Sequence, residues 1–215
     1  PAVQVMPAGS AESRTLAAAA GGADQYMVAC EHQRNGGIYF DIHGRVVLMN
    51  DTVLLYKSGN SRFYLKNSLT GGAADTAFRF GPAGSGWKPL VGDWNRDGLD
   101  TIGLFNPVAA KFQLKNLNTG GVADISFSFG PRNKNWIPVA GDWDMDGKSD
   151  IGLYDPVKSR FFLKNGLSGG QADYTFRYGP SNSGWQPVAG DWNGDGRDTI
   201  GLYSRSEEHT SELQS

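Results

Sequence analysis

The sequence predicts an all-β fold assembled from one small β-sheet that is repeated along the chain. The main evidence is a segment that begins Gly-Asp-Trp and recurs from Gly92, Gly141 and Gly190, at a constant spacing of 49 residues. Residues 92–140 and 141–189 are identical at 26 of 49 positions. A fixed period of this length indicates one supersecondary unit copied several times, in which each unit needs its neighbours to bury an apolar face.

Each unit contains four short segments that are typical of β-strands. In one unit these segments are 137–141, 151–154, 160–165 and 174–178. Glycine, proline and asparagine separate them at intervals of about 8–12 residues, as expected for strands joined by tight turns. No segment of a unit is long enough, free of glycine and proline, and apolar at helical spacing to predict a helix.

Four strands in 49 residues are the content of one β-propeller blade. The coils of a β-helix, the rival repeat fold, are shorter and simpler, and a sandwich would not repeat at identical spacing. We therefore predict a partial β-propeller with about three to four blades in an open arc. The first unit is less regular, because residues 44–50 contain no acidic segment where the later units have one.

The predicted repeat region spans residues 41–204, with units at about 44–86, 87–135, 136–184 and 185–204. Residues 1–40 match no repeat: the first 20 or so are linker-like in composition, and the rest are unassigned. Residues 205–215 resemble the in-frame translation of a common sequencing adapter, so we interpret them as an artefact. The repeat stops partway through a unit, and we expect a truncated fragment of a longer protein. An open arc of this kind exposes sheet edges that favour association.

Bulk composition excludes several classes of protein. A chain of 215 residues with 39% hydrophobic residues can bury a sizeable core. No stretch approaches the roughly 18 apolar residues of a membrane span. The net charge of −2 argues against a nucleic-acid partner, which would favour a basic face. The single cysteine, Cys30, excludes an intrachain disulfide framework.

The segment after Gly141 has the residue pattern of a calcium loop. Its alternate carboxylates can turn their oxygens inward around a hard cation, and the glycine at the sixth position permits the sharp bend. Calcium takes six to eight oxygen ligands at about 2.3–2.6 Å. The predicted ligands are the side chains of Asp142, Asp144, Asp146 and Asp150 and the main-chain carbonyl of Lys148.

The other two copies of this segment differ at the last ligand. Their ninth position is Thr101 or Thr199, and a carboxylate stands one residue earlier. That carboxylate could swing in as the ligand, or a water could fill the place. The predicted ligands are Asp93, Asn95, Asp97, the carbonyl of Leu99 and Asp100 in one copy, and Asp191, Asn193, Asp195, the carbonyl of Arg197 and Asp198 in the other.

Two alternatives to a calcium loop share parts of this residue pattern. An EF-hand would carry a glutamate at the twelfth position, where this chain has Leu104, Leu153 and Leu202, and helices would flank it. The segments are therefore not EF-hands. The second alternative is an Asp/Asn/Gly turn held by its own hydrogen bonds, without a metal. Three copies at constant spacing favour metal binding.

The combined pattern resembles the FG-GAP or VCBS-type repeat of integrin-α-like propellers, over about residues 53–204. The pattern is an aromatic residue and glycine closing a unit, then Val-Ala-Gly or Leu-Val-Gly, then the Asp-rich loop; the closing pairs are Phe80-Gly81, Phe129-Gly130 and Tyr178-Gly179. The resemblance implies a propeller of typically seven blades, with calcium between the first and second strands of a blade. It also implies a secreted or cell-surface setting.

By this resemblance we expect a non-catalytic, calcium-binding module for adhesion or for binding a carbohydrate or protein ligand. The alternative is the propeller portion of a polysaccharide-active hydrolase or lyase whose catalytic part is missing. The six tryptophans all lie in the repeats, and we expect them to pack between blades rather than to bind sugar. Lys66, Lys115 and Lys164 recur at one place, which we interpret as a solvated strand edge.

Overall fold

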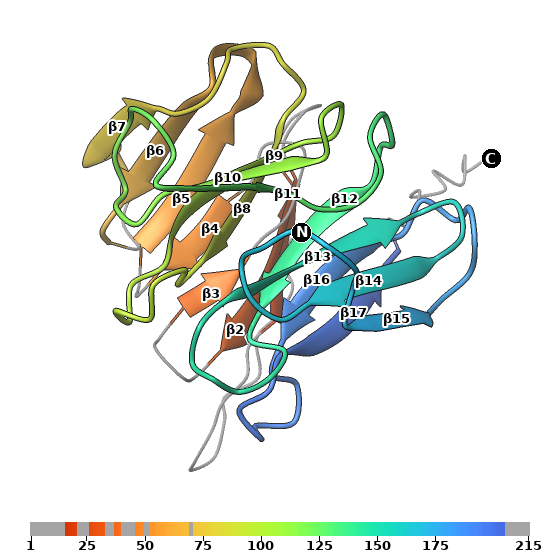
Figure 1. Ribbon diagram of the computed structural model, residues 1–215. Helices are drawn as coiled ribbons and strands as arrows, with labels where there is room; N and C mark the ends of the chain where they lie inside the picture. Colours follow the sequence, from red (N-terminus) through yellow and green to blue (C-terminus); the bar gives the residue numbers. More distant parts are fainter. Residues whose placement is uncertain are drawn as a thin grey trace, which may run out of the picture.

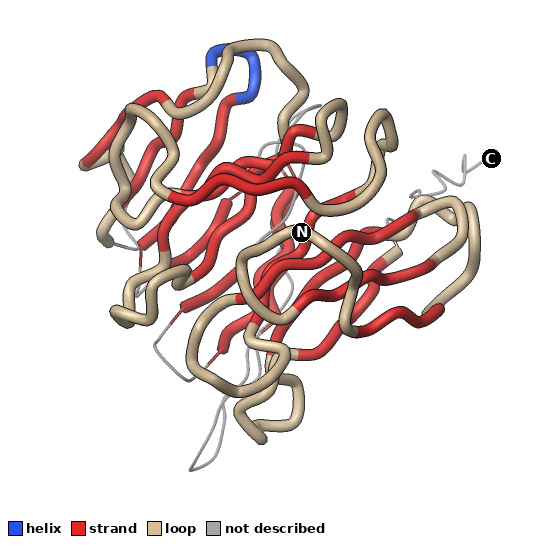
Figure 2. The backbone as a smooth tube through the Cα atoms, viewed as in Figure 1, coloured by secondary structure: helices blue, strands red, loops and turns tan. Residues whose placement is uncertain are grey.

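The computed structural model confirms an all-β fold of repeated antiparallel sheets (Figure 1). It describes residues 52–68 and 71–204, and before them the strands β1 to β4. The predicted adapter-derived segment 205–215 lies outside the described residues. The only helical element in the described part is the short 3-10 turn η1 (Ser58–Asn60), seen in blue in Figure 2. None of the described residues form a helix that could span a bilayer.

Three four-stranded sheets follow one another along the chain, each with its strands in sequence order. The first sheet contains β4 (Val46–Met49), β5 (Thr52–Lys57), β6 (Arg62–Lys66) and β7 (Thr76–Arg79). The second sheet contains β8 (Lys88–Gly92), β9 (Thr101–Asn106), β10 (Lys111–Leu114) and β11 (Ile125–Ser128). The third sheet contains β12 (Ile137–Gly141), β13 (Asp150–Asp155), β14 (Arg160–Lys164) and β15 (Tyr174–Arg177).

Two smaller sheets complete the described structure. The final sheet is the two-stranded pair of β16 (Gln186–Gly190) and β17 (Thr199–Tyr203). The other is a three-stranded sheet of β1 (Leu16–Ala20), β2 (Tyr26–His32) and β3 (Gly37–Tyr39), in a part of the chain that matches no repeat. The sheets form an open array, and the described residues do not close a ring (Figure 1).

The strand register is the same in successive sheets, so residues at equivalent places in the 49-residue repeat pair in the same way. On the first two strands, Leu90 pairs with Gly103 in the second sheet and Val139 pairs with Gly152 in the third. A row of aromatic rings crosses each sheet from its second to its fourth strand, with centroids 4.5–5.8 Å apart in successive contacts. Such ring pairs stabilise a sheet beyond the area that they bury. The rows are Tyr56–Phe63–Phe78, Phe105–Phe112–Phe127 and Tyr154–Phe161–Phe176.

Each apolar core lies between two successive sheets, because one sheet face packs on the first two strands of the next sheet. The first core joins residues of the first sheet to Val91, Ile102 and Leu104 of the second. The second core joins the second sheet to Ile151 and Leu153 of the third. The third core packs the third sheet against β16 and β17. A single unit therefore cannot bury its own face, as the repeat predicts.

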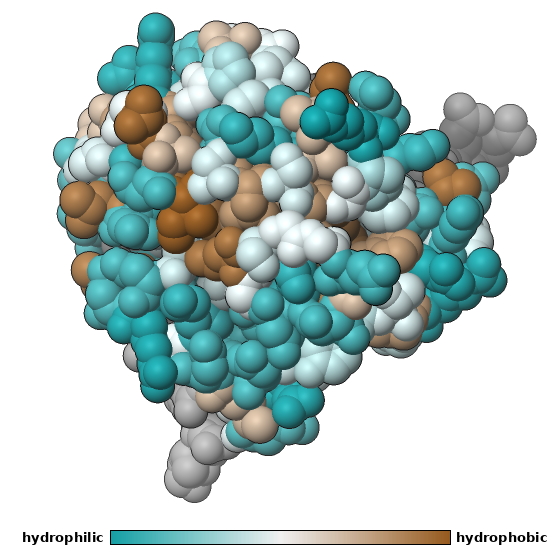
Figure 3. Space-filling model, viewed as in Figure 1, coloured by the Kyte–Doolittle hydropathy of each residue, from teal (hydrophilic) through white to brown (hydrophobic). Residues whose placement is uncertain are grey.

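Four of the six tryptophans, Trp87, Trp94, Trp136 and Trp143, belong to these cores, as expected. Trp94 and Trp143 are 1% and 2% exposed and belong to the second and third cores. Trp136 stacks on Phe162 with ring centroids 4.6 Å apart. Trp192, in the segment between β16 and β17, is 38% exposed. On the face shown in Figure 3 the surface is mostly hydrophilic, and hydrophobic residues form only scattered small patches.

The interpretation of the recurring lysines as a solvated edge is wrong. The side chain of Lys115 is only 8% exposed and lies 3.0 Å from the carboxylate of Asp124, while its Nζ also donates to the carbonyl of Val122. That carboxylate accepts the main-chain N–H of Asn116, and this hydrogen bond is the main cause that lowers the pKa of Asp124. The same Lys-Asn-Asp arrangement recurs at Lys66, Asn67 and Asp75 and at Lys164, Asn165 and Asp173.

Candidate metal centre

The three Asp-rich segments each connect the first and second strands of a sheet, as predicted. We call them loop 1 (93–101), loop 2 (142–150) and loop 3 (191–199), and number their positions one to nine. They follow β8, β12 and β16, and lie in a row along the lower side of Figure 1. Backbone hydrogen bonds between neighbouring loops confirm that they lie side by side. The packing of successive sheets therefore brings three copies of one acidic loop together.

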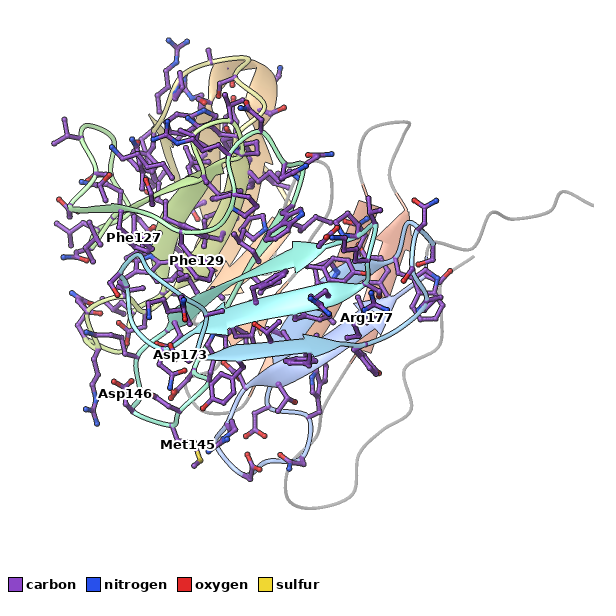
Figure 4. All side chains as sticks on the ribbon, turned by 45° about the vertical axis from the view of Figure 1, so that its right-hand side comes forward. Phe127, Phe129, Met145, Asp146, Asp173 and Arg177 are labelled. Carbon is purple, nitrogen blue, oxygen red and sulfur yellow. The ribbon has the colours of Figure 1, made fainter. Side chains whose placement is uncertain are left out.

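Loop 2 gathers three carboxylates. One carboxylate oxygen from each of Asp142, Asp144 and Asp146 lies within 4.8 Å of the others. Asp146 is exposed at the tip of the loop, beside Met145 (Figure 4). Three oxygens at this separation could bind one hard cation after small side-chain movements, since oxygens that share a calcium ion at 2.3–2.6 Å are themselves a few ångströms apart.

The first aspartate holds the loop in its bent shape. In loop 2, Asp142 Oδ1 accepts the N–H of Asp146 at 3.1 Å and Oδ2 accepts the N–H of Gly147 at 2.8 Å. The N–H of Lys148 donates to Asp146 Oδ1 at 2.7 Å. Loops 1 and 3 repeat these bonds, so the predicted carbonyl ligands Leu99, Lys148 and Arg197 occupy equivalent places.

The bend requires left-handed backbone at two positions of each loop. The sixth position is glycine in all three copies, with φ of 82°, 82° and 90°. The fourth position is Arg96, Met145 or Gly194, with φ of 62°, 66° and 77°. Left-handed backbone costs a non-glycine residue roughly 1–2 kcal/mol. Loops 1 and 2 therefore retain strain that the glycine of loop 3 avoids.

Loops 1 and 3 carry less negative charge at the centre. Their third position is an asparagine, and the amide of Asn95 donates to Asp97 Oδ2 while that of Asn193 donates to Asp195 Oδ2, both at 2.9 Å. In loop 3, the hydrogen bond from the N–H of Arg197, followed by that from Asn193, lowers the pKa of Asp195. Among the described residues, only loop 2 brings three acidic side chains within 4.8 Å.

Asp150, the predicted ninth-position ligand of loop 2, lies outside that group of three. It is 2% exposed, and its two oxygens accept the main-chain N–H groups of Trp143 and Gly166. Burial raises its pKa from 3.8 to about 7, and the carboxylates of Asp144 and Asp146 add to the rise. A buried acid facing two further acids is the electrostatic setting that a divalent cation would relieve. The residues present therefore fit such an ion.

The ninth position in the other loops is part of the sheet. Thr101 is buried, and its hydroxyl donates to the carbonyl of Lys115 at 2.5 Å and lies 3.4 Å from the carbonyl of Gly92. Thr199 donates to the carbonyl of Gly190 at 3.4 Å. These hydroxyls tie neighbouring strands together where loop 2 has a carboxylate.

The side chain at the eighth position of loop 3 contacts the neighbouring sheet, and the sequence analysis did not predict this contact. The predicted ligand Asp198 accepts the N–H of Asp142, in loop 2, at 2.8 Å through Oδ2. It does not join Asp191 and Asp195 in a group of three carboxylates within 4.8 Å. The carbonyl of Asp100 accepts the amide of Asn118, and the ligand role of its carboxylate stays a prediction.

Comparison with known proteins does not assign the chain to a family. A scan against protein-family models finds no match, and a search of curated proteins finds no significant match. The findings establish repeated small antiparallel sheets with recurring aromatic rows and an acidic group that could hold a metal ion.

The raised pKa of Asp150 gives a prediction for the metal-free protein. An acid with a higher pKa in the folded state binds more protons when folded, here between about pH 4 and 7. The free energy of unfolding that this group contributes therefore falls as the pH rises through that window. Asp150→Asn cannot ionise, so in buffers freed of calcium with a chelating resin the stability of wild type relative to this variant should fall from pH 4.5 to pH 7.5.

Urea unfolding of both proteins at several pH values measures this difference. The comparison with the variant removes the contributions of the other carboxylates, which are present in both. A stability difference that stays constant with pH would contradict the shifted titration of Asp150.

Proposed function

We propose that this chain is a calcium-binding repeat module of the FG-GAP or VCBS type, with propeller-like architecture. In this proposal it has no catalytic role and serves adhesion or the binding of a protein or carbohydrate ligand, in a secreted or cell-surface protein. The observation that carries the proposal is the carboxylate group of Asp142, Asp144 and Asp146, in a loop built three times at the same junction between strands.

The chemistry of the donors favours calcium over other cations. All the side-chain donors are carboxylate or amide oxygens, which are ligands for hard cations rather than for zinc or copper. Magnesium demands near-ideal octahedral geometry and releases its waters reluctantly, whereas calcium accepts irregular sets of six to eight oxygens. A loop with three gathered carboxylates and exposed sides suits calcium, with water completing the coordination.

In this proposal the calcium ion has a structural role and stabilises the folded protein. A ligand that binds only the folded state stabilises it by RT ln(1 + [Ca]/Kd), or about 2.7 kcal/mol at a hundredfold excess over Kd. Loop 2 also lies at the junction between the third sheet and the β16–β17 sheet, because Asp142 bonds to Asp198. Calcium in loop 2 would thereby stabilise the packing of two sheets and keep a ligand-binding surface rigid.

Calcium removal tests the proposal directly. We expect excess EGTA to lower the melting temperature by roughly 5–10 °C. In a domain of this size each kcal/mol of lost stability lowers the melting temperature by about 2–4 °C, and the lost calcium binding amounts to about 2.7 kcal/mol. Circular dichroism at varied temperature measures the shift. Added calcium should restore the original curve, and added magnesium should not. Superimposable curves with and without EGTA would count against bound calcium.

The ligand assignment predicts a contrast between two neighbouring residues. Asp146→Ala removes a carboxylate of the gathered group, whereas Lys148→Ala keeps the main-chain carbonyl that is its predicted donor. We expect at least a tenfold larger loss of calcium affinity for Asp146→Ala, because removing a charged ligand costs more than 1.4 kcal/mol. Isothermal titration calorimetry measures both affinities. Equal affinities in the two variants would show that the assignment is wrong.

A further inference from the structure

Neighbouring loops are joined by a reciprocal pair of hydrogen bonds. The N–H of Asp142, at position one of loop 2, donates to Asp198 Oδ2 at 2.8 Å, and the N–H of Asp198 donates to the carbonyl of Asp142 at 2.9 Å. At the preceding junction, the N–H of Asp93 donates to Ser149 Oγ at 2.9 Å, and the N–H of Ser149 donates to the carbonyl of Asp93 at 2.8 Å. At both junctions, the residue at position eight of the later loop is thus hydrogen-bonded to the residue at position one of the loop before it.

The close approach at both junctions depends on the glycine that ends the first strand. A Cβ at Gly92 would lie 2.6 Å from Ser149 Cβ, and a Cβ at Gly141 would lie 2.9 Å from Asp198 Cβ. Real Cβ atoms do not approach so closely, so any other residue would push the loops apart. Gly92 and Gly141 therefore provide the space into which position eight of the next loop fits.

The two junctions make the same bond with different side chains. Ser149 is neutral and Asp198 is charged, yet each presents one oxygen to the N–H of the first aspartate. An acceptor oxygen is therefore the feature that the two junctions share.

We propose that Asp198 and Ser149 are positioning residues, each of which fixes the first aspartate of the metal loop in the preceding sheet. Asp142 is the residue around which loop 2 folds, since its carboxylate accepts the N–H groups of Asp146 and Gly147. Fixing its main chain from the neighbouring sheet sets the place from which its carboxylate faces Asp144 and Asp146. Asp198 acts on loop 2 in this way, rather than as a ligand of loop 3.

The consequence is that the first aspartate of loop 1 and of loop 2 is tied to the following sheet. The main chain of Asp142 in loop 2 is held in this way when β16 and β17 are packed against the third sheet, because Asp198 lies in the segment between those two strands. The metal affinity of this site, which rests on the calcium binding proposed above, is thus linked to the assembly of the neighbouring unit. Outer hydrogen-bond partners of metal ligands typically change affinity by 10–100-fold when removed.

The test measures loop 2 alone. In a background that carries Asp97→Asn and Asp195→Asn, which weaken loops 1 and 3, calcium chloride is titrated by calorimetry into Asp198→Ala, Asp198→Asn and Asp198→Ser. We expect Asp198→Ala to weaken binding about tenfold. Asp198→Ser should stay within about threefold of the background, because serine makes the equivalent bond at position 149. Asp198→Asn retains an acceptor oxygen and should do the same.

The outcomes separate positioning from simple charge. If Asp198→Ser and Asp198→Asn lose as much affinity as Asp198→Ala, the negative charge is responsible and the positioning role is overturned. Unchanged affinity in Asp198→Ala overturns it equally. A loss of calcium affinity in Asp198→Ala alone, with the affinity kept in Asp198→Ser and Asp198→Asn, supports the positioning role.

A second measurement does not depend on calcium. Amide hydrogen exchange in EGTA should show that the N–H of Asp142 loses protection at least tenfold in Asp198→Ala and keeps it in Asp198→Ser. The matched control is Ser149→Ala, which should expose the N–H of Asp93 and leave that of Asp142 protected. If the background protein binds no calcium, the proposed function fails, while the exchange pattern still decides whether Asp198 positions Asp142. Unchanged protection of Asp142 in Asp198→Ala would overturn the inference.

Discussion

A contact between a glycine at the end of one sheet and a leucine of the next sheet recurs at each of the three junctions between the sheets from β4 to β17, and the stacking of these sheets depends on it. Gly130 follows β11 with φ of 89°, and a Cβ at this position would collide with Leu153 Cδ1 of β13. The same contact joins Gly81 to Leu104 and Gly179 to Leu202. The glycine is needed twice, for its left-handed backbone and for the space that the leucine fills. The aromatic-glycine pair that closes each unit therefore has a packing role.

This packing places the acidic loops next to one another. The leucine of a sheet's second strand packs on the preceding sheet, and the first strand of the same sheet then ends next to the Asp-rich loop of that preceding sheet. Position eight of the later loop thereby contacts position one of the earlier loop. Carboxylates thereby gather on one side of the array, and Asp150 is buried beside Asp144 and Asp146. The electrostatic cost of these acids and the geometry of their oxygens both favour a bound cation. The calcium binding proposed above would therefore depend on how the sheets stack.

The sequence predicted what is contained within one unit and missed what crosses between units. Strand number, the position of the loops and the burial of Trp94 and Trp143 follow from periodicity inside 49 residues. The role of Asp198 was missed because its partner Asp142 lies 56 residues away, in the preceding unit. The burial of Lys115 was missed although its partner is local, since Asp124 lies only nine residues later in the same unit. The recurrence of this lysine and aspartate in three units was the available signal.

A double-mutant cycle at Gly130 and Leu153 tests the central contact most directly. The two single variants, Gly130→Ala and Leu153→Ala, should each destabilise the protein in urea unfolding, by roughly 2–5 kcal/mol for the leucine. The cavity left by Leu153→Ala accommodates the added methyl group, so the double variant should be at least about 1 kcal/mol more stable than the sum of the two losses predicts. Losses that add within about 0.5 kcal/mol would show that the glycine and the leucine are independent, and that this contact does not set the stacking of the sheets.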